Sequence, residues 1–575
     1  MANTFNIRIG GEAGQGLVSI GSILMRAAAR EGWYLFAHQD YESRIRGGHN
    51  FFQIRLGSSP LAAGEDRLDL VVSLDQATIP RAQEHLTDDS LIIYDPDVFK
   101  AAPPFAGQEN VIAIRFVQVT EKMGQPKIMA NAVAAGAVWA LLSDDFTGLA
   151  ETLAELFAGR GEAVVAGNQS VARAGFDKVR EIAAGRPKPA KPERPGARIL
   201  LNGNDALPLG ALAAGLKFMS AYPMTPATGI TEFISRHGRE AAVVMEQAED
   251  EISAINMALG ASFAGARAMT ATSGGGFALM TEALGLAGSA EIPIVVINAQ
   301  RPGPSTGLPT RTEQGDLTFA TAMSFGDFPR AVLAPGDVTE AFYLMGEAFN
   351  LAEQFQMPVV VLSDQHLADS YTTAAPFAPE RVKIDRGKLA SGAEAGQDYL
   401  RYRFTEDGIS PRLYPGFGAG LVISAGDEHD QKGHLTEDAE TRAKMVEKRM
   451  AKQKLVEERV LRPVLCGAEQ PQIVLIGFGS TKGAIAEAVS RLNKSGTKAR
   501  GVHLPQVFPL PDSLGEILMG PGEKYVVESN VSGQLQALIA SRFAWKPRGH
   551  VRRYDGRPIN APYILDWLEG GGARD

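Results

Sequence analysis

The chain has 575 residues, of which 45% are hydrophobic and 21% charged, the composition of a globular protein with enough length for roughly three or four domains. Its formal net charge of −9 excludes a nucleic-acid binder that works by bulk positive charge. The single cysteine, Cys466, excludes an internal disulfide framework and any cysteine-ligated iron–sulfur or zinc site held by this chain alone, and it indicates the reducing cytoplasm.

Membrane insertion is not expected. The longest apolar stretch, residues 128–142, is interrupted by Asn131 and is shorter than the roughly 17–25 residues of a spanning helix. The N-terminus lacks a basic segment followed by an apolar run, so we expect no signal peptide. A cytoplasmic protein without a membrane partner is predicted.

The first 185 residues alternate between strand and helix patterns. Residues 5–9 alternate apolar and polar side chains as a strand does, a glycine turn follows, and residues 17–29 have helical spacing. Further strands are expected at 68–74 and 90–94. Short apolar strands that alternate with helices favour a parallel α/β sheet.

A proline-rich segment, RPKPAKPER, begins at Arg186 and ends this domain. Four prolines between Pro187 and Pro195 forbid a continuous helix and favour an extended, solvated linker, which we place at residues 186–198.

The strand and helix alternation resumes after the linker. Buried strands are expected at 241–245, 266–270, 292–297 and 357–362, whereas residues 376–433 show no clear period. Residues 436–461 predict one long helix, capped by Thr436 and with Glu440 four residues before Lys444, and we interpret it as a solvated arm.

A last α/β domain follows. Residues 473–480 predict a strand and a glycine turn, a helix starts at Lys482, and residues 525–527 predict another strand.

Glycines mark a candidate anion site after the first strand, in the segment GGEAGQG. Glycines before a helix let backbone N–H groups approach an anion, which makes Gly11, Gly14, Gln15 and Gly16 candidate ligand residues. Ser19 stands where a dinucleotide fingerprint has Gly or Ala, so the alternatives are another phosphate-bearing ligand and a structural turn.

A second candidate is the segment RIRGGHN. Arg44 and Arg46 beside the flexible pair Gly47 and Gly48 suit a pyrophosphate, and a solvated turn is the alternative.

The segment AYPMTPATG presents a polar side chain on a rigid backbone. Pro223 and Pro226 flank Thr225 and hold its hydroxyl in place, as a substrate-orienting site requires. The alternative is a proline-rich loop that starts a helix at Thr228.

Acidic residues follow the next strand. Among Glu246, Glu249 and Glu251, most are expected to be surface charge at a helix N-terminus, but a buried one could polarise a ring nitrogen of a cofactor. Arg301, at the end of a buried strand, could clamp a carboxylate or form a structural ion pair.

The histidines do not predict a metal site. His429 and His434, with Asp427 and Asp430, lie in a polar stretch without an established ligand spacing, so we expect no metal bound by this chain.

Together these segments resemble the 2-oxoacid:ferredoxin oxidoreductases, over nearly the whole chain. GGEAGQG and RIRGGHN resemble the family's γ domain, and Tyr222 begins its YPxTP signature. Arg301 with GPSTGLPT, Gln314 and the segment HLPQVFPLP complete the α-subunit pattern. The order of γ domain, proline linker and α subunit resembles the fused subunit of 2-oxoglutarate synthases.

The resemblance implies an α/β fold with several parallel-sheet domains. A γ-type, coenzyme A-associated domain would occupy residues 1–185, followed by the linker at 186–198. A pyrimidine-binding-type domain with a charged insertion and a helical arm would occupy 199–465, and a domain like the C-terminal domain of transketolase would occupy 466–575.

The resemblance also implies roles for the candidate residues. Thr225 would bind the 2-oxoacid, Arg301 would lie near its carboxylate, and Glu251 would hold the aminopyrimidine of thiamine diphosphate. We choose Glu251 because the small-residue segment GASFAG follows nine residues later, although Glu246 and Glu249 compete for the role. The remaining implied ligand residues are Tyr222 and Pro223 for thiamine, and Gly11, Gly14, Gln15, Gly16, Arg44, Arg46, Gly47 and Gly48 for coenzyme A.

Two family features are missing. The chain lacks the GDG motif with its later asparagines, which binds the diphosphate and Mg²⁺, and it lacks cysteines for the 4Fe–4S cluster. Both absences imply a β subunit that shares the thiamine diphosphate, supplies Mg²⁺ and the cluster, and assembles with this chain as a dimer of αβ heterodimers.

The implied reaction is coenzyme A-dependent oxidative decarboxylation of 2-oxoglutarate to succinyl-CoA and CO₂, with electrons passed to ferredoxin. Its reverse would serve CO₂ fixation in a reductive TCA cycle. Pyruvate or a branched-chain 2-oxoacid remains an alternative substrate. A non-catalytic nucleotide-binding scaffold and a nicotinamide- or flavin-linked dehydrogenase are alternatives from other classes.

Overall fold

The computed structural model describes residues 4–43, 47–99, 107–182, 184, 186, 188–193 and 196–570. The chain separates into two compact units. The first comprises Met1–Leu201 and Ser370–Pro376, and the second comprises Asn202–Asp369 and Phe377–Asp575.

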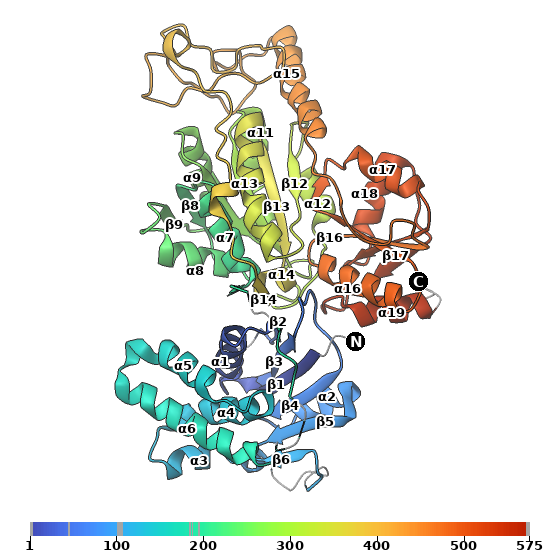
Figure 1. The fold of residues 1–575 in the computed structure, drawn as a ribbon. Coiled ribbons are helices and arrows are strands. Elements are labelled where there is room, and N and C mark those ends of the chain that lie inside the picture. The colour runs from blue at the N-terminus through green and yellow to red at the C-terminus, as the bar shows by residue number, and fades with distance from the viewer. Residues whose placement is uncertain are drawn as a thin grey trace. The chain divides into compact units, whose positions relative to one another are not determined.

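One mixed sheet forms the centre of the first unit (Figure 1). Its eight strands within the described residues are, in spatial order, β6 (Val111–Ala113), β5 (Leu86–Tyr94), β4 (Leu68–Ser73), β1 (Thr4–Ala13), β3 (Gly47–Gly57), β2 (Tyr34–Asp40), β14 (Tyr371–Ala374) and β7 (Ile199–Leu201). Strand β14 therefore comes from a segment far along the chain.

Half of this sheet differs from the expected parallel arrangement. Strands β1, β4, β5 and β6 run parallel, with Ile7 opposite Leu70, whereas β1 and β3 run antiparallel, with Ile7 opposite Ile54. The other neighbours, from β3 to β7, are antiparallel as well. Strand β2 ends at Asp40 and β3 begins at Gly47, and so short a connection can join only antiparallel neighbours.

Helices cover both faces of the sheet. They are α1 (Leu17–Arg30), α2 (Thr78–Ala82), α3 (Phe116–Lys122), α4 (Ala130–Leu142), α5 (Thr147–Phe157) and α6 (Glu162–Arg180). Helices α1, α4, α5 and α6 share one core with β1, β3 and β4. In this core Trp33 and Trp139 meet edge to face, with ring centroids 5.9 Å apart. A smaller core between α2 and the sheet contains Ile79 and Ile92.

The apolar stretch near residue 130 is a buried helix. Nearly every residue of α4 is buried, because α4 packs against α1, α3 and α6. No helix within the described residues has the length and apolar character needed to cross a membrane.

Described residues of the proline-rich linker contact the first unit, although Ala190, Lys191 and Glu193 are exposed. Lys191 Nζ lies 2.6 Å from Glu31 Oε2 and 4.8 Å from the ring centroid of Trp33. Trp33 Nε1 donates to the carbonyl of Ala190 at 3.1 Å. The indole N–H of buried Trp33 thus gives the extended segment a hydrogen-bond donor.

A seven-stranded sheet forms the centre of the second unit, counted over its described residues. In spatial order it contains β18 (Gln506–Phe508), β12 (Ala331–Leu333), β13 (Pro358–Asp364), β11 (Ile294–Gln300), β10 (Ala268–Thr272), β8 (Phe218–Ala221) and β9 (Val244–Gln247). All neighbours are parallel except β12 and β18. The predicted strands at 266–270, 292–297 and 357–362 correspond to β10, β11 and β13.

Strand β9 corrects one expectation. It covers Val244–Gln247 rather than 241–245, and it is an edge strand that is largely exposed, with Val244 59% accessible. An edge strand has only one neighbour, so its apolar sequence is not buried by a second strand.

Helices flank this sheet. They are α7 (Gly203–Ala213), α8 (Thr228–His237), α9 (Glu251–Phe263), α10 (Gly274–Leu279), α11 (Thr281–Ser289), α12 (Leu317–Ala322), α13 (Val338–Phe355) and α14 (Gln365–Asp369). Helix α8 begins at Thr228, where the prolines predict a helix start.

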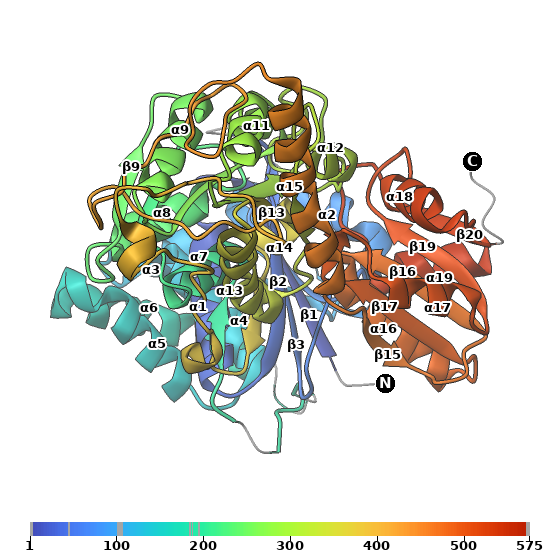
Figure 2. The ribbon, with the colours of Figure 1, turned by 90° about the horizontal axis from the view of Figure 1, so that it is seen from above.

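The C-terminal part has a sheet of five strands in the described chain (Figure 2). These are β15 (Val464–Gly467), β17 (Ala499–Leu504), β16 (Ile473–Phe478), β19 (Glu523–Glu528) and β20 (Gly549–Arg552), with α16 (Thr481–Lys494), α17 (Asp512–Met519), α18 (Gln534–Phe543) and α19 (Ala561–Glu569) around them. One continuous core joins this sheet to the seven-stranded one, and β18 pairs with β12. The two sheets therefore form one packed body.

Helix α15 (Ala439–Glu458) differs from the expected solvated arm. Its cap is Asp438, not Thr436, because the Asp438 carboxylate accepts from the backbone N–H of Thr441 at 2.8 Å. One face is buried: Lys448 and Lys452 donate to Glu291 at 2.6 and 2.7 Å. The arm is thus attached to the domain that carries α13, against which it packs (Figure 2).

Candidate functional site

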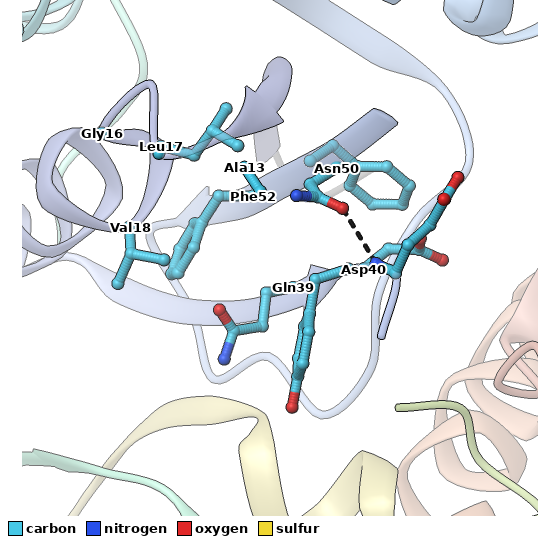
Figure 3. A pocket seen from close by; sticks show the side chains of 12 residues that line it. Ala13, Gly16, Leu17, Val18, Gln39, Asp40, Asn50 and Phe52 are labelled. Carbon is cyan, nitrogen blue, oxygen red and sulfur yellow. Dashed lines mark hydrogen bonds between the residues drawn. The ribbon is translucent and has the colours of Figure 1, made fainter. Parts of the chain in front are cut away.

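The first unit contains a cavity of about 500 Å³ at the carboxyl end of β1. Figure 3 shows the side chains around it, contributed by the glycine turn, by the start of α1, by the end of β2 and by β3. The lining residues are Ala13, Gly14, Gly16, Leu17, Val18, Gln39, Asp40, Tyr41, Glu42, Asn50, Phe51 and Phe52.

The glycine turn is shaped by steric need. Gly16 precedes α1 with φ of 82°, and a Cβ there would lie 1.9 Å from Asn131 Nδ2. Gly14 has φ of 92°. Only glycine fits both conformations easily, and the turn leaves the first N–H groups of α1 beside the cavity.

Not every predicted residue of this turn lines the cavity. The Gln15 side chain accepts from the backbone N–H of Glu12 at 2.7 Å, so it stabilises the turn itself. A Cβ at Gly11 would lie 2.6 Å from Gln15 Oε1, which shows that Gly11 makes room for that contact. Neither residue is among the cavity's lining residues.

The structure describes only part of the second predicted segment, RIRGGHN. Gly47 and Gly48 begin β3 with φ of 72° and 74°, and Gly47 lies opposite Ala13 of β1. Arg44 and Arg46 lie outside the described residues. The Gly-Gly pair therefore borders the glycine turn, and the two arginines stay a prediction.

The second unit has a different candidate site at the carboxyl ends of its parallel strands. Strand β8 lies between β9 and β10, so the chain leaves β8 toward one edge of the sheet and continues from β10 toward the other. Open parallel sheets bind ligands outside such a switch point. The carboxyl ends of β8, β10 and β11 meet there: Thr225 and Arg301 follow β8 and β11, and Thr272 is the last residue of β10.

Thr225 and Arg301 are brought together. Arg301 Nη1 donates to the Thr225 carbonyl at 2.7 Å, and Asn204 Nδ2 donates to the carbonyl of Pro226 at 2.9 Å. The backbone around Thr225 is thus held from two sides. Tyr222 is 40% exposed and Pro223 is half-buried in the same loop.

Within the described residues, the bond to Thr225 is the one hydrogen bond of the Arg301 guanidinium, so its remaining N–H groups can receive a carboxylate. Burial lowers the pKa of Arg301, and the charge of Asp316 opposes that shift. Arginine stays protonated nevertheless at any physiological pH.

The three acidic candidates are separated by burial. Glu246 and Glu249 are exposed, whereas Glu251 is 3% exposed at the first position of α9. Asp250 caps the helix by accepting from the Ser253 N–H at 2.7 Å, which leaves Glu251 free of a capping role. Glu251 Oε1 is buried without a hydrogen-bond partner within the described residues.

A buried carboxylate oxygen without a partner is costly, and such an atom points to a ligand that completes its hydrogen bonds. Glycine makes room beside it: a Cβ at Gly276 would lie 2.7 Å from Glu251 Oε1 and 2.1 Å from Thr272 Oγ1. These residues fit the aminopyrimidine of a thiamine cofactor, whose ring nitrogen needs a carboxylate partner and a close backbone surface.

A polar network beside Arg301 was not predicted. Asn298 Nδ2 donates to Asp316 Oδ2 at 3.2 Å, and Gln300 Oε1 accepts from the Asp316 N–H at 3.0 Å. Burial raises the pKa of Asp316. Burial, and then the charge of Asp316, raises the pKa of Glu313 to about 7. The sequence signal for this network is the pair of amide side chains at the end of the strand sequence IVVINAQ.

Gln314, part of the family pattern, joins the two sheets of the second unit. Its Nε2 donates to the Phe478 carbonyl at 2.9 Å, and its Oε1 accepts from the Ser529 N–H at 3.0 Å. The loop that follows Arg301 is therefore anchored on the C-terminal sheet.

The described residues contain no group of three or more metal-ligating side chains. His429 is buried, and its ring nitrogens lie 3.1 Å from the Asp430 carbonyl and 3.2 Å from the Ser289 carbonyl. Its polar contacts are therefore to backbone oxygens.

Two family models match the chain. "Pyruvate ferredoxin/flavodoxin oxidoreductase" covers residues 6–178, and "Pyruvate flavodoxin/ferredoxin oxidoreductase, thiamine diP-bdg" covers residues 209–448. The second match contains the strand-end site with Thr225, Glu251 and Arg301.

Relatives match over nearly the whole length. The 2-oxoacid:ferredoxin oxidoreductase 2 subunit alpha of Aeropyrum pernix is 34% identical over 96% of this chain and 95% of that protein. The 2-oxoglutarate oxidoreductase subunit KorA of Mycobacterium tuberculosis is 29% identical over 93% and 87%.

A solved structure also matches: the 2-oxoglutarate:ferredoxin oxidoreductase of Magnetococcus marinus, with 2-oxoglutarate, coenzyme A and succinyl-CoA bound. It has a TM-score of 0.91 and 33% identity, covering 99% of this chain and 100% of that one. The chain therefore belongs to the α-subunit family of the 2-oxoacid:ferredoxin oxidoreductases.

Proposed function

We propose that this chain is the α subunit of an enzyme that converts 2-oxoglutarate and coenzyme A to succinyl-CoA and CO₂, with ferredoxin as electron acceptor, or that catalyses the reverse carboxylation. The names of the Mycobacterium tuberculosis and Magnetococcus marinus proteins support 2-oxoglutarate, whereas the Aeropyrum pernix relative carries the broader name 2-oxoacid. Pyruvate and branched-chain 2-oxoacids are the competing substrates.

Glu251 would hold the aminopyrimidine of thiamine diphosphate, with Tyr222 and Pro223 beside the ring. When bound, this cofactor supplies the carbanion stabilisation that decarboxylation of a 2-oxoacid requires. Glu251 itself would accept a hydrogen bond from a ring N–H and, as a buried carboxylate, favour protonation of that nitrogen.

Arg301 and Thr225 would bind the 2-oxoacid. The unused N–H groups of Arg301 suit the C1 carboxylate, while the bond from Nη1 to the Thr225 carbonyl fixes the distance between the guanidinium and the threonine loop. Thr225 Oγ1 would donate to a substrate oxygen. Because the turn is also held by Asn204, substrate orientation would not depend on a flexible loop.

Coenzyme A would occupy the cavity of the first unit. Its phosphates would meet the backbone N–H groups at Gly14, Gly16 and the start of α1, where glycine turn and helix dipole both favour an anion. Arg44 and Arg46 would add positive charge, and Gly11, Gln15, Gly47 and Gly48 would shape the backbone around the site.

A β subunit would complete the enzyme. It would bind the diphosphate through Mg²⁺ and carry the 4Fe–4S cluster, since this chain has one cysteine and its described residues hold no metal-ligating group. We expect a dimer of αβ heterodimers that works in the cytoplasm. A role in CO₂ fixation through a reductive TCA cycle belongs to the same proposal.

One observation carries the proposal: the buried Glu251 carboxylate, whose Oε1 has no hydrogen-bond partner in the described part of the chain, lies at the same sheet edge as the Thr225–Arg301 pair. The test is anaerobic, coenzyme A-dependent reduction of a viologen dye by the chain co-expressed with its β partner, with 2-oxoglutarate, pyruvate and 2-oxoisovalerate compared by kcat/KM. We expect 2-oxoglutarate to be preferred at least tenfold. Preference for another 2-oxoacid would reassign the substrate. If a complex that contains thiamine and iron reduces no dye with any 2-oxoacid, the proposed function is wrong.

A further inference from the structure

Helix α9 has an exposed side without charge. The structure describes all of its residues, and the exposed ones are Ile252, Asn256, Met257 and Gly260. Its one ionisable residue, Glu251, is buried. Ile252 and Met257 are 51% and 40% exposed. Surface helices normally turn charged residues toward water, so the outer side of α9 has the character of a surface that another protein covers.

Helix α8 shows the usual pattern on the same sheet. It exposes Glu232, Ser235, Arg236 and His237. Arg236 Nη2 lies 3.3 Å from Glu232 Oε2, an ion pair one turn apart on the solvated side. The exposed side of α8 is therefore suited to water, and the uncharged exterior of α9 is a property of that helix and not of the whole domain.

Helices α10 and α12 extend the uncharged surface. Helix α10 packs against α9, and Phe277 of α10 meets Phe319 of α12 with ring centroids 5.3 Å apart. Leu279 of α10 is 51% exposed, and Phe319 is exposed as well. Both helices are fully described and contain no charged residue, and exposed Glu282 follows in α11. We call the following exposed residues together the uncharged face: Ile252, Met257, Gly260, Gly275, Leu279 and Phe319.

Two glycines leave open space on the uncharged face. A Cβ built at Gly260 or at Gly275 would meet no described atom of a neighbouring element within 4 Å. Gly260 lies inside α9, where glycine destabilises a helix relative to alanine and where no described neighbour requires it. A missing side chain does allow the backbone of another molecule to approach closely. Gly260 therefore suits a close contact with a partner.

The uncharged face borders an incomplete site. Ile252 follows Glu251 in α9, and Gly275 precedes Gly276, where an added Cβ would lie 2.7 Å from Glu251 Oε1. Glu251 is buried, and its Oε1 has no hydrogen-bond partner within the described residues. A buried oxygen in that state points to a group that another molecule supplies. This observation is independent of the composition of the face.

The missing half of the site identifies the occupant. This chain lacks the GDG motif for the diphosphate of the thiamine cofactor, so the β partner that would supply it has to reach the edge where Glu251 lies. This step rests on the proposed function. A partner surface rich in charge would lose its hydration against the uncharged face and gain no ion pair in return. The occupant therefore presents an apolar surface.

We propose that the uncharged face is the docking surface of the β partner, and that an apolar surface of the partner covers it and closes the Glu251 site. Protein interfaces are depleted of charge at their centre and enriched in methionine and aromatic residues, as this face is. In the complex Met257 is buried, and a backbone segment of the partner approaches Gly260.

The first experiment places the photo-crosslinking amino acid p-benzoylphenylalanine at position 257 of this chain, in the complex with the β partner. Position 235 is the matched control, because Ser235 is exposed on α8 among charged residues. We expect irradiation to join position 257 to the β partner and position 235 to neither chain. A cross-link from position 257 to a second copy of this chain, or no cross-link from it, would overturn the assignment.

Two substitutions measure what the face contributes to association. Met257→Lys places a charge under the partner, and Gly260→Gln fills the space that the partner backbone uses. We expect each to raise the Kd for the β partner at least tenfold. The melting temperature of this chain alone should not fall, because Met257 is exposed and Gly260 has open space beside it. Ser235→Lys and Ser235→Gln should leave the Kd within twofold of wild type.

The outcomes separate the docking surface from the proposed function. A wild-type Kd in both α9 variants, or an equal loss with Ser235→Lys, would overturn the docking surface even if the complex reduces viologen normally. If the α9 variants weaken association but the wild-type complex reduces no viologen with any 2-oxoacid, the function fails and the docking surface stands. If a variant lowers the melting temperature of the chain, the cross-link from position 257 still decides.

Discussion

Replacing Glu251 by glutamine tests the choice among three neighbouring acids. The side chain keeps its size, and an amide oxygen can still accept a hydrogen bond, but the negative charge disappears. Glu246→Gln and Glu249→Gln are matched controls, because both carboxylates are exposed and lie within five residues of Glu251 along the chain.

The expected loss follows from the burial of the carboxylate. Glu251 is 3% exposed and its Oε1 has no partner within the described residues, so its hydrogen bond to a cofactor nitrogen would be charge-assisted and shielded from water. Hydrogen bonds to charged groups contribute about 1.5–3 kcal/mol. Since about 1.36 kcal/mol corresponds to a tenfold change in rate, kcat should fall roughly 10- to 150-fold.

The assay is viologen reduction by the αβ complex at saturating 2-oxoacid and coenzyme A, together with the thiamine diphosphate concentration that gives half-maximal activity. We expect Glu251→Gln to lower kcat and to raise that concentration, while both control variants stay within twofold of wild type. Full activity of Glu251→Gln would refute the role, and so would an equal loss in Glu246→Gln or Glu249→Gln.

Three further results are expected. Asn204→Ala removes the 2.9 Å bond to the Pro226 carbonyl and should raise the KM for the 2-oxoacid about two- to tenfold, from the roughly 0.5–1.5 kcal/mol of a hydrogen bond, while the coenzyme A KM stays constant. Glu291→Gln leaves two buried lysines without their counter-charge and should lower the free energy of urea unfolding by about 3–5 kcal/mol, more than Lys452→Met does. Burial with a neighbouring carboxylate raises the pKa of Glu313 to about 7, so the folded state keeps the Glu313 proton that the unfolded state loses. The free energy of unfolding should therefore fall as pH rises from about 4.3 to 7, and Glu313→Gln should reduce this pH dependence in urea titrations.

Much of the fold could be predicted from local sequence patterns. The strand, glycine turn and helix at the N-terminus were predictable, because alternation, glycine and helical spacing follow one another within 30 residues. The antiparallel pairing of β14 with β2 and β7 was not, since Tyr371–Ala374 joins the first sheet from a distant segment. Strand pairing over such separations leaves no local pattern in the sequence.

Helix α15 shows that the burial of side chains is equally hard to predict from local sequence. Its sequence is rich in charge and predicts an exposed arm, yet Lys452 is fully buried because Glu291, 161 residues earlier, provides its partner. Burial lowers the pKa of Lys452 to about 8 even with that partner. Charge alone therefore does not reveal which lysines face water.

Part of the candidate site could be predicted from the sequence, and part could not. The motif around Thr225 and the strand that ends at Arg301 were visible separately, and the structure adds the hydrogen bond between them. Sequence left Glu246, Glu249 and Glu251 in competition, and only the packing of α9 distinguishes the buried one. The network of acidic and amide side chains beside Arg301 depends on the geometry of the loops, and no sequence motif predicts it.

The central claim is that this chain holds half of a thiamine diphosphate site. The most direct measurement compares this chain alone, its β partner alone and the complex, each for bound thiamine diphosphate and for 2-oxoglutarate- and coenzyme A-dependent dye reduction. The account predicts stoichiometric cofactor and turnover only in the complex, with both reduced in the complex that carries Glu251→Gln. Turnover by the isolated chain, or full cofactor retention without the Glu251 carboxylate, would contradict it.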